Sequence, residues 1–63
     1  MEGVIKALKA DKGFGFIKAA GGTEYFFHFS CAPEWDQLRE GQRVTFAEEH
    51  SPKGPRATDV RSM

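Results

Sequence analysis

The sequence has a single cysteine, Cys31, among its 63 residues. One thiol cannot form an internal disulfide, and this is typical of proteins that work in a reducing compartment. A chain of this length also buries only about 60% of the surface that its unfolded form exposes. We therefore expect one domain over residues 1–63 whose marginal stability depends on packing alone.

Long apolar runs are missing as well. No stretch is long enough to span a membrane, and residues 1–13 have neither the apolar run nor the small-residue cleavage site of a signal peptide. The hydrophobic content of 40% is too high for a disordered chain. These features predict a soluble protein of the cytoplasm that makes no contact with a membrane.

The chain has no excess of either charge. Nine basic and nine acidic residues give a formal net charge of zero, so no global positive field attracts polyanions. The distribution along the sequence is uneven. Residues 1–18 contain four lysines and two carboxylates, and residues 53–63 contain three cations and one carboxylate. Residues 34–52 contain five carboxylates and two arginines. Two basic ends brought together would form one positive face, although scattered solubilising charges account for the same pattern.

Helical periodicity is also absent, because no dozen residues keep apolar positions three and four apart without an intervening glycine or proline. Short segments rich in β-branched and aromatic residues instead predict five strands, with turn residues between them. Five antiparallel strands with no covering helix leave exposed edges unless the sheet closes, so we expect a small all-β barrel. The predicted strands are Val4–Lys9, Gly13–Ala19, Thr23–Ser30, Arg43–Glu48 and Ala57–Arg61.

Aromatic side chains, in contrast, are concentrated, because six of the eight lie between Lys12 and Ser30. Alternation along a strand places Phe14 and Phe16 on one face, with Gly13, Gly15 and Ile17 on the other. Glycine weakens the interior of a strand, so two glycines on the core-facing side indicate a close approach of the backbone or a local bend.

The same alternation separates the residues of YFFHFS. It places Tyr25 and Phe27 inward and Phe26 and His28 outward. Further rings would overfill so small a barrel, so we expect Phe14, Phe16 and Phe26 to face outward. The predicted core consists of Ile5, Ile17, Tyr25, Phe27, Val44, Phe46 and Val60.

An outward aromatic cluster flanked by Lys6 and Lys12 is typical of a contact surface. Unpaired nucleobases stack on flat rings with about 1–3 kcal/mol per base, while cations meet the phosphates. The pattern therefore predicts binding of single-stranded nucleic acid.

Two motifs carry a resemblance to a known family. KGFGFI resembles the first ribonucleoprotein motif of the cold-shock domain family and YFFHFS resembles the second, with agreeing spacing from Gly3 to Val60. The resemblance implies a five-stranded antiparallel oligonucleotide/oligosaccharide-binding (OB) barrel. It also implies a nucleic-acid chaperone that binds single-stranded RNA or DNA with a preference for pyrimidine-rich stretches, without catalysis.

Carried over by position, the resemblance also implies a binding surface. We expect a monomer, with weak dimerisation left open. The binding residues are Lys6, Lys9, Lys12, Phe14, Phe16, Phe26, His28, Phe29, Trp35, Lys53 and Arg56, of which the last two lie in or beside a loop, SPKGPR.

The first strand departs from the family pattern. Lys6-Ala7-Leu8-Lys9 stands where the family typically reads Lys-Trp-Phe-Asn, so we expect a binding surface that has lost an indole and a phenyl ring and gained a charge. The loss of one stacked base, at about 1–3 kcal/mol, weakens affinity roughly five- to 150-fold.

Other chemistries have little support. His28, Cys31 and His50 lack a fourth ligand, so no metal is expected. His28 and Ser30 have no third group to form a catalytic set, and GFGFIK lacks the third glycine of a dinucleotide fingerprint, so neither an enzyme nor a cofactor is expected. The alternative function is a protein-interaction or self-association module with a depleted stacking surface. Salt distinguishes the two, because only phosphate binding weakens steeply as salt rises.

Overall fold

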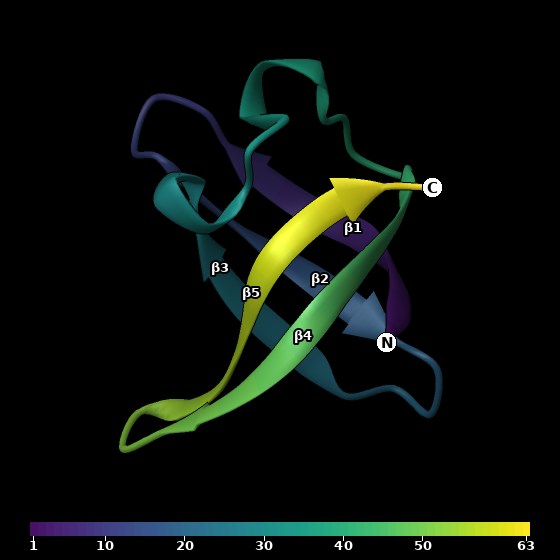
Figure 1. Ribbon diagram of the computed structural model, residues 1–63, viewed down its shortest axis with the longest axis vertical. Helices are drawn as coiled ribbons and strands as arrows, with labels where there is room; N and C mark the ends of the chain where they lie inside the picture. The colour runs from purple at the N-terminus through teal and green to yellow at the C-terminus, as the bar shows by residue number, and fades with distance from the viewer.

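The computed structural model describes residues 1–63, which form a closed barrel of five strands (Figure 1). The strands are β1 (Glu2–Lys9), β2 (Phe14–Ala19), β3 (Glu24–His28), β4 (Arg43–Ser51) and β5 (Gly54–Ser62). The strand order around the barrel is β1-β2-β3-β5-β4, and β1 closes it by pairing with β4. The predicted all-β barrel and all five strands are therefore confirmed.

One strand pair differs from the predicted antiparallel arrangement. β3 and β5 run parallel and share one register pair, Phe26 with Arg56. The strand order makes this unavoidable, because β5 is antiparallel to β4, which is antiparallel to β1, and β3 runs in the same direction as β1. All the other neighbours are antiparallel.

Seven of the ten predicted strand boundaries were wrong by one to three residues, and the differences in two regions concern the candidate site. The third strand ends at His28 and not at Ser30, because Phe29–Cys31 form a 3₁₀ turn, η1. The predicted loop SPKGPR is largely strand, since β4 runs to Ser51 and β5 begins at Gly54, and only residues 52–53 turn. Gly54 has a φ of 119°, a value that glycine adopts without a steric penalty, and this permits so short a turn.

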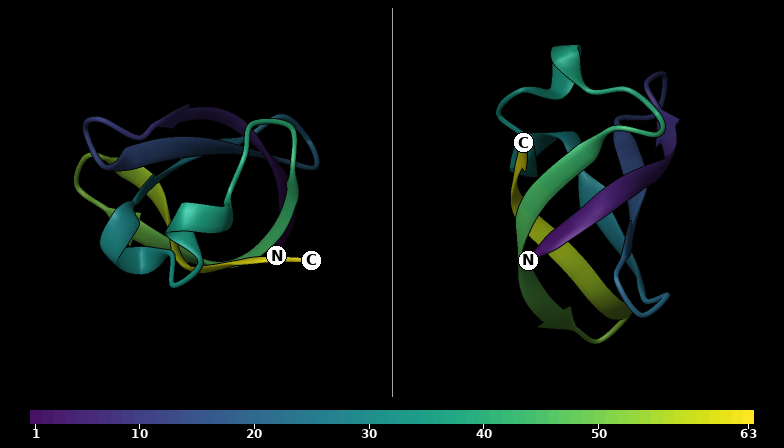
Figure 2. Two further views of the ribbon diagram at one scale, coloured as in Figure 1. Left: turned by 90° about the horizontal axis from the view of Figure 1, so that it is seen from above. Right: turned by 90° about the vertical axis from the view of Figure 1, so that its right-hand side faces the viewer.

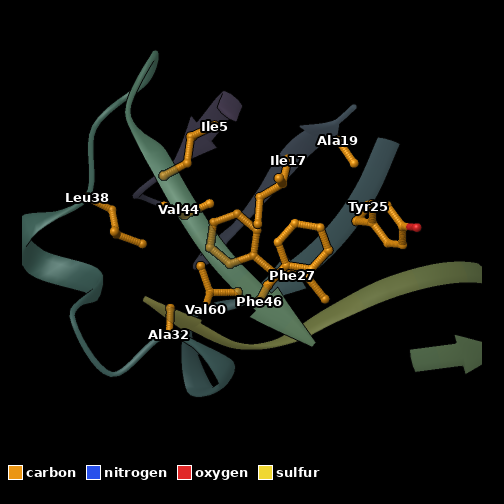
Figure 3. Close-up of a cluster of buried hydrophobic side chains, with 11 residues drawn as sticks. Ile5, Ile17, Ala19, Tyr25, Phe27, Ala32, Leu38, Val44, Phe46 and Val60 are labelled. Carbon is orange, nitrogen blue, oxygen red and sulfur yellow. The ribbon is translucent and has the colours of Figure 1, made fainter. Parts of the chain in front are cut away.

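The core lies inside the barrel and contains all seven predicted residues (Figure 3). Four further core residues were not predicted: Ala19, Ala32, Leu38 and Ala57. Ala32 and Leu38 come from the β3–β4 connection, which crosses the end of the barrel shown at the top of Figure 1 and of the right-hand view of Figure 2. That connection contains η1 and a second 3₁₀ turn, η2 (Trp35–Gln37).

The ring of Phe27 occupies the middle of the core and is fully buried. It lies against the backbone of Gly15, where a Cβ atom would come within 2.8 Å of the ring. The predicted close approach at this glycine is thus confirmed, because any side chain at position 15 would displace Phe27.

Tyr25 also points inward, and its polar tip reaches the edge of the barrel (Figure 3). The Tyr25 hydroxyl donates a hydrogen bond of 2.6 Å to a carboxylate oxygen of Glu48. This bond, together with burial of the ring, raises the pKa of Tyr25 above its ordinary value. A large tyrosine therefore fits an inward position without an unsatisfied hydroxyl.

The β3–β4 connection is attached to β5 through Glu34. One carboxylate oxygen of Glu34 accepts hydrogen bonds from the Ser62 hydroxyl at 2.6 Å and from the Ser62 amide at 2.9 Å. The hydroxyl bond first, and then the amide bond, lower the pKa of Glu34 below its ordinary value of about 4.5. Ionised Glu34 therefore links the connection to the last strand.

The core position of Phe27 makes a first prediction. Phe27→Ala should lower the free energy of unfolding by about 3–5 kcal/mol, a large part of the roughly 3–9 kcal/mol expected for a chain of this length. Phe26→Ala, at a ring 37% exposed on the outside, should cost about 1 kcal/mol or less. Urea melts measure both values, and an equal loss for the two variants would show that the facing of β3 is wrong.

The Glu34 link makes a second prediction, on pH. A carboxyl group whose pKa is lower in the folded state stabilises the fold fully above its unfolded pKa, near 4.5, and this contribution is lost as pH falls through the folded value. The unfolding free energy of Glu34→Gln should therefore decline less between about pH 5 and pH 3 than that of the wild type. Asp36→Asn, which removes an exposed carboxylate with no hydrogen bond, is the matched control for the loss of one negative charge. A wild-type slope in Glu34→Gln would contradict the assignment.

Candidate nucleic-acid interface

The registers of β1, β2 and β3 align outward side chains into rows, because residues directly opposite each other in an antiparallel pair share a face. The three strands lie side by side behind β4 and β5 in Figure 1. The first row crosses the strands near the β1–β2 turn, and the third lies at the other end of β2. The rows are Lys9–Phe14–His28, Ala7–Phe16–Phe26 and Val4–Lys18–Glu24.

Phe14, Phe16 and Phe26 form one aromatic cluster in these rows. Their ring centroids lie 5.6–5.9 Å apart, and Phe16 meets both neighbours edge to face. None of the three belongs to the core, so their predicted outward orientation is confirmed. We call Phe14, Phe16 and Phe26 the aromatic platform.

A second aromatic group, formed by His28, Phe29 and Trp35, continues from the platform. The rings of His28 and Phe29 are 4.5 Å apart, and those of Phe29 and Trp35 are 6.3 Å apart. His28 is the register partner of Phe14, which joins the two groups. Phe29 is 50% exposed, so its ring is accessible from solvent.

Gly13 allows Phe29 to occupy this position. Its φ is 76°, and a Cβ atom there would come within 2.9 Å of the Phe29 ring. The Gly13 carbonyl accepts a hydrogen bond of 2.9 Å from the Phe29 amide. A side chain at position 13 would therefore strain the backbone and displace the ring.

Trp35 contributes to both the surface and the interior. Its indole is half-buried and meets the ring of Phe27 at 5.9 Å, and it packs against the core. A groove of about 630 Å³ runs between Trp35, Phe29 and Lys12. The indole thus lies beside the rings predicted to bind bases, with one part of its surface facing this groove.

The His28 ring is oriented by η1. Its Nδ1 accepts a hydrogen bond of 3.3 Å from the Ser30 amide and lies 2.9 Å from the Ser30 hydroxyl oxygen. Since Nδ1 accepts, the neutral ring carries its hydrogen on Nε2. The imidazole therefore offers a stacking face and one N–H donor.

Leu8 corrects the expectation that the platform has lost two rings. The β1–β2 register shifts between Ile5 and Ala7, so Lys6 is the extra residue of a β-bulge. The bulge reverses the alternation, so that Leu8 pairs with Gly15 and packs against the core. Only Ala7, which is opposite Phe16 in the second row, leaves a gap in the platform.

Two of the predicted cations are already paired with carboxylates. The Lys6 ammonium donates a hydrogen bond of 2.8 Å to Glu24, and the Arg56 guanidinium lies 3.7 Å from Glu49. Hydrogen bonding to Lys6, and then its charge, lower the pKa of Glu24, with a further contribution from Lys18. Glu24 is therefore ionised at neutral pH and competes with any phosphate for Lys6.

Arg56 and the three remaining predicted cations lie at different distances from the platform. Arg56 pairs in register with Phe26, so it lies at the platform edge, where a terminal nitrogen is 3.9 Å from the Cys31 sulfur. Lys9 lies in the first row, and Lys12 lines the groove at Trp35. Lys53 occupies the turn of the β4–β5 hairpin, three residues from Arg56 and away from the rows.

Sequence reasoning missed Glu24 and Glu49 as neighbours of the binding cations. For Glu24 a signal existed, because alternation in β2 and β3 places it opposite Lys18 on the outward face. Glu49 gave no signal, since its contact with Arg56 depends on the extended β4–β5 hairpin.

No group of three or more histidine, cysteine or acidic side chains is arranged to hold a metal ion. The chain forms no helix of the length and hydropathy needed to cross a bilayer.

Comparison with known proteins agrees with this geometry. The family model described as the 'Cold-shock' DNA-binding domain matches residues 1–63. Cold shock protein 2 of Lactiplantibacillus plantarum is 48% identical over 94% of this chain and 92% of its own length. The cold shock-like protein CspB of Escherichia coli is 46% identical over 95% of this chain and 89% of its own. The chain therefore belongs to the cold-shock domain family.

The Lys6–Glu24 pair makes a third prediction. Glu24→Gln should release Lys6 for phosphate contact, so affinity for oligothymidine at low salt should rise roughly two- to fivefold. The slope of log affinity against log salt should steepen by about 0.7, the value for one phosphate contact on a single strand. Fluorescence titration at several salt concentrations gives both quantities.

Asp59→Asn is the matched control, because it also removes a carboxylate from an ion pair, with Arg61, outside the three rows. It should leave the slope unchanged. Equal gains in the two variants would point to general electrostatics instead of Lys6.

Proposed function

We propose that this protein binds single-stranded RNA or DNA by stacking bases on the aromatic platform and on the His28–Phe29–Trp35 group. Continuity of the two groups carries the proposal, since each is a set of neighbouring rings and the two meet where Phe14 and His28 are register partners. Such stacking contributes about 1–3 kcal/mol per base and tolerates any sequence.

Phosphate contacts supply the second part of the binding. Lys9 and Lys12 make no ion pair, so both are free to meet the backbone of a strand lying along the rings. Lys6 contributes only after exchanging the Glu24 carboxylate for a phosphate, whereas the charge of Arg56 is partly offset by Glu49, 3.7 Å away and not hydrogen-bonded to it. Lys53 would join only if the strand reached the hairpin turn. Affinity should therefore depend on stacking more than on charge.

The biological role that follows is that of a nucleic-acid chaperone. A base stacked on a protein ring is held in the unpaired state, so occupancy of the platform keeps strands from pairing. We place this activity in the cytoplasm and assign it to the monomer, with one domain over residues 1–63. Pyrimidine-rich stretches are the preferred ligands, and no chemical step on the nucleic acid is involved.

Fluorescence of Trp35, the only tryptophan, tests the proposal as a fourth prediction. Titration with oligothymidine and oligouridine at low salt should change the emission and saturate. Phe26→Ala should weaken binding by about 1–3 kcal/mol while the protein stays folded. A flat titration with both ligands, confirmed by a second method such as gel shift, would contradict the proposal. Protein-partner binding through the same rings would then be the better explanation.

Filling the gap at Ala7 is the fifth prediction. Ala7→Trp should tighten binding to a thymidine heptamer by about 1–2 kcal/mol, because it adds a ring to the row of Phe16 and Phe26. The salt slope should stay the same, since a new stack adds no phosphate contact. Lys9→Ala is the matched comparison and should flatten the slope by about 0.7. Unchanged affinity in a folded Ala7→Trp variant would show that the bases do not pass over β1.

A further inference from the structure

The largest cavity of the molecule lies outside the aromatic groups. It is a groove of about 660 Å³ between the start of β1, the β2–β3 turn and the C-terminus. Its lining includes Val4, Lys18, Ala20, Arg43 and Met63, and it contains no aromatic ring. Nothing in the proposed stacking surface uses this groove except Lys6 at its border.

The groove begins where the rows of the platform end. Val4 and Lys18 are register partners in the third row, and Val4 also pairs with Arg43 of β4 on its other side. Successive rows are two residues apart on β2, which corresponds to about 7 Å along a strand. A nucleic-acid strand that crosses Phe14 and Phe16 therefore meets Lys18 next.

The chemistry of the groove fits a phosphodiester backbone better than bases. Lys18 and Arg43 are exposed and make no ion pair. Glu2 is the acidic residue of the lining, and Glu24, the register partner of Lys18, is hydrogen-bonded to Lys6. Val4 is 39% exposed and Met63 is 63% exposed, so the floor is apolar but offers no ring for stacking. Two free cations over an aliphatic floor suit phosphates and the sugars between them.

We propose that this groove holds the backbone of the same bound strand after it leaves the aromatic platform. The footprint of the protein on a single strand is then longer than the stretch that the rings contact. The inference rests on the proposed function, because a strand that never reaches Phe16 cannot continue into the groove.

The test compares a thymidine heptamer with a dodecamer on the intact protein. The double variant Lys18→Ala/Arg43→Ala should bind the dodecamer roughly two- to 30-fold more weakly than the wild type at low salt. Its salt slope for the dodecamer should be smaller by about 1.4, the value for two phosphate contacts. Binding of the heptamer should be almost unchanged. The charge-conserving variant Lys18→Arg/Arg43→Lys should restore binding of the dodecamer.

Lys12→Ala is the matched control, because it removes an exposed lysine beside the aromatic groups. It should weaken both oligonucleotides equally. Val4→Glu provides a second probe, since it places a carboxylate between Lys18 and Arg43 and should selectively weaken the dodecamer. Urea melts verify that each variant is folded.

The outcomes separate the two proposals. If the heptamer binds and the double variant loses nothing on the dodecamer, the groove proposal is overturned and the proposed function stands. Equal weakening of heptamer and dodecamer binding would also overturn it, because Lys18 and Arg43 would then attract any oligonucleotide by long-range electrostatics without contacting the end of a longer strand. If neither oligonucleotide binds to the wild type, the proposed function itself fails.

Discussion

The contact between the Phe27 ring and the Gly15 backbone determines which aromatic side chains of this protein lie inside the barrel and which lie outside it. Phe27, Tyr25 and Phe46 supply the rings of the core, and aliphatic side chains fill the remaining space. Because interiors are close-packed, further rings have no place inside so small a barrel. Phe14, Phe16 and Phe26 are therefore presented outside, where the registers of β2 and β3 hold them within 6 Å of each other.

The charges of the surface limit what these rings can do. Lys6 and Arg56 are paired with carboxylates, and the whole chain is neutral, so little long-range attraction brings a polyanion to the platform. Under the proposed function, a ligand gains most of its affinity by stacking and must displace Glu24 to use Lys6. Lys18 and Arg43 in the neighbouring groove make no ion pair, and under the proposed groove binding they would supply the phosphate contacts that the platform lacks.

Much of this arrangement could be predicted from the sequence, because alternation and turn residues are local signals. They predicted all five strands, seven of the eleven core residues and the outward rings of β2 and β3. The bulge at Lys6 could not be predicted, and it turns Leu8 inward by reversing the alternation of β1. The contribution of Leu38 and the Glu49–Arg56 pair were also missed, since both depend on contacts between segments distant in sequence.

The central claim is that bases stack on the outward rings while the core rings take no part. Intermolecular nuclear Overhauser effects between a thymidine heptamer and the ring protons of the protein test it most directly. We predict such effects from the thymine protons to Phe14, Phe16 and Phe26, and none to Phe27 or Phe46. The central claim would be contradicted if, at saturation, the platform rings gave no such effects and only residues outside the three rows did.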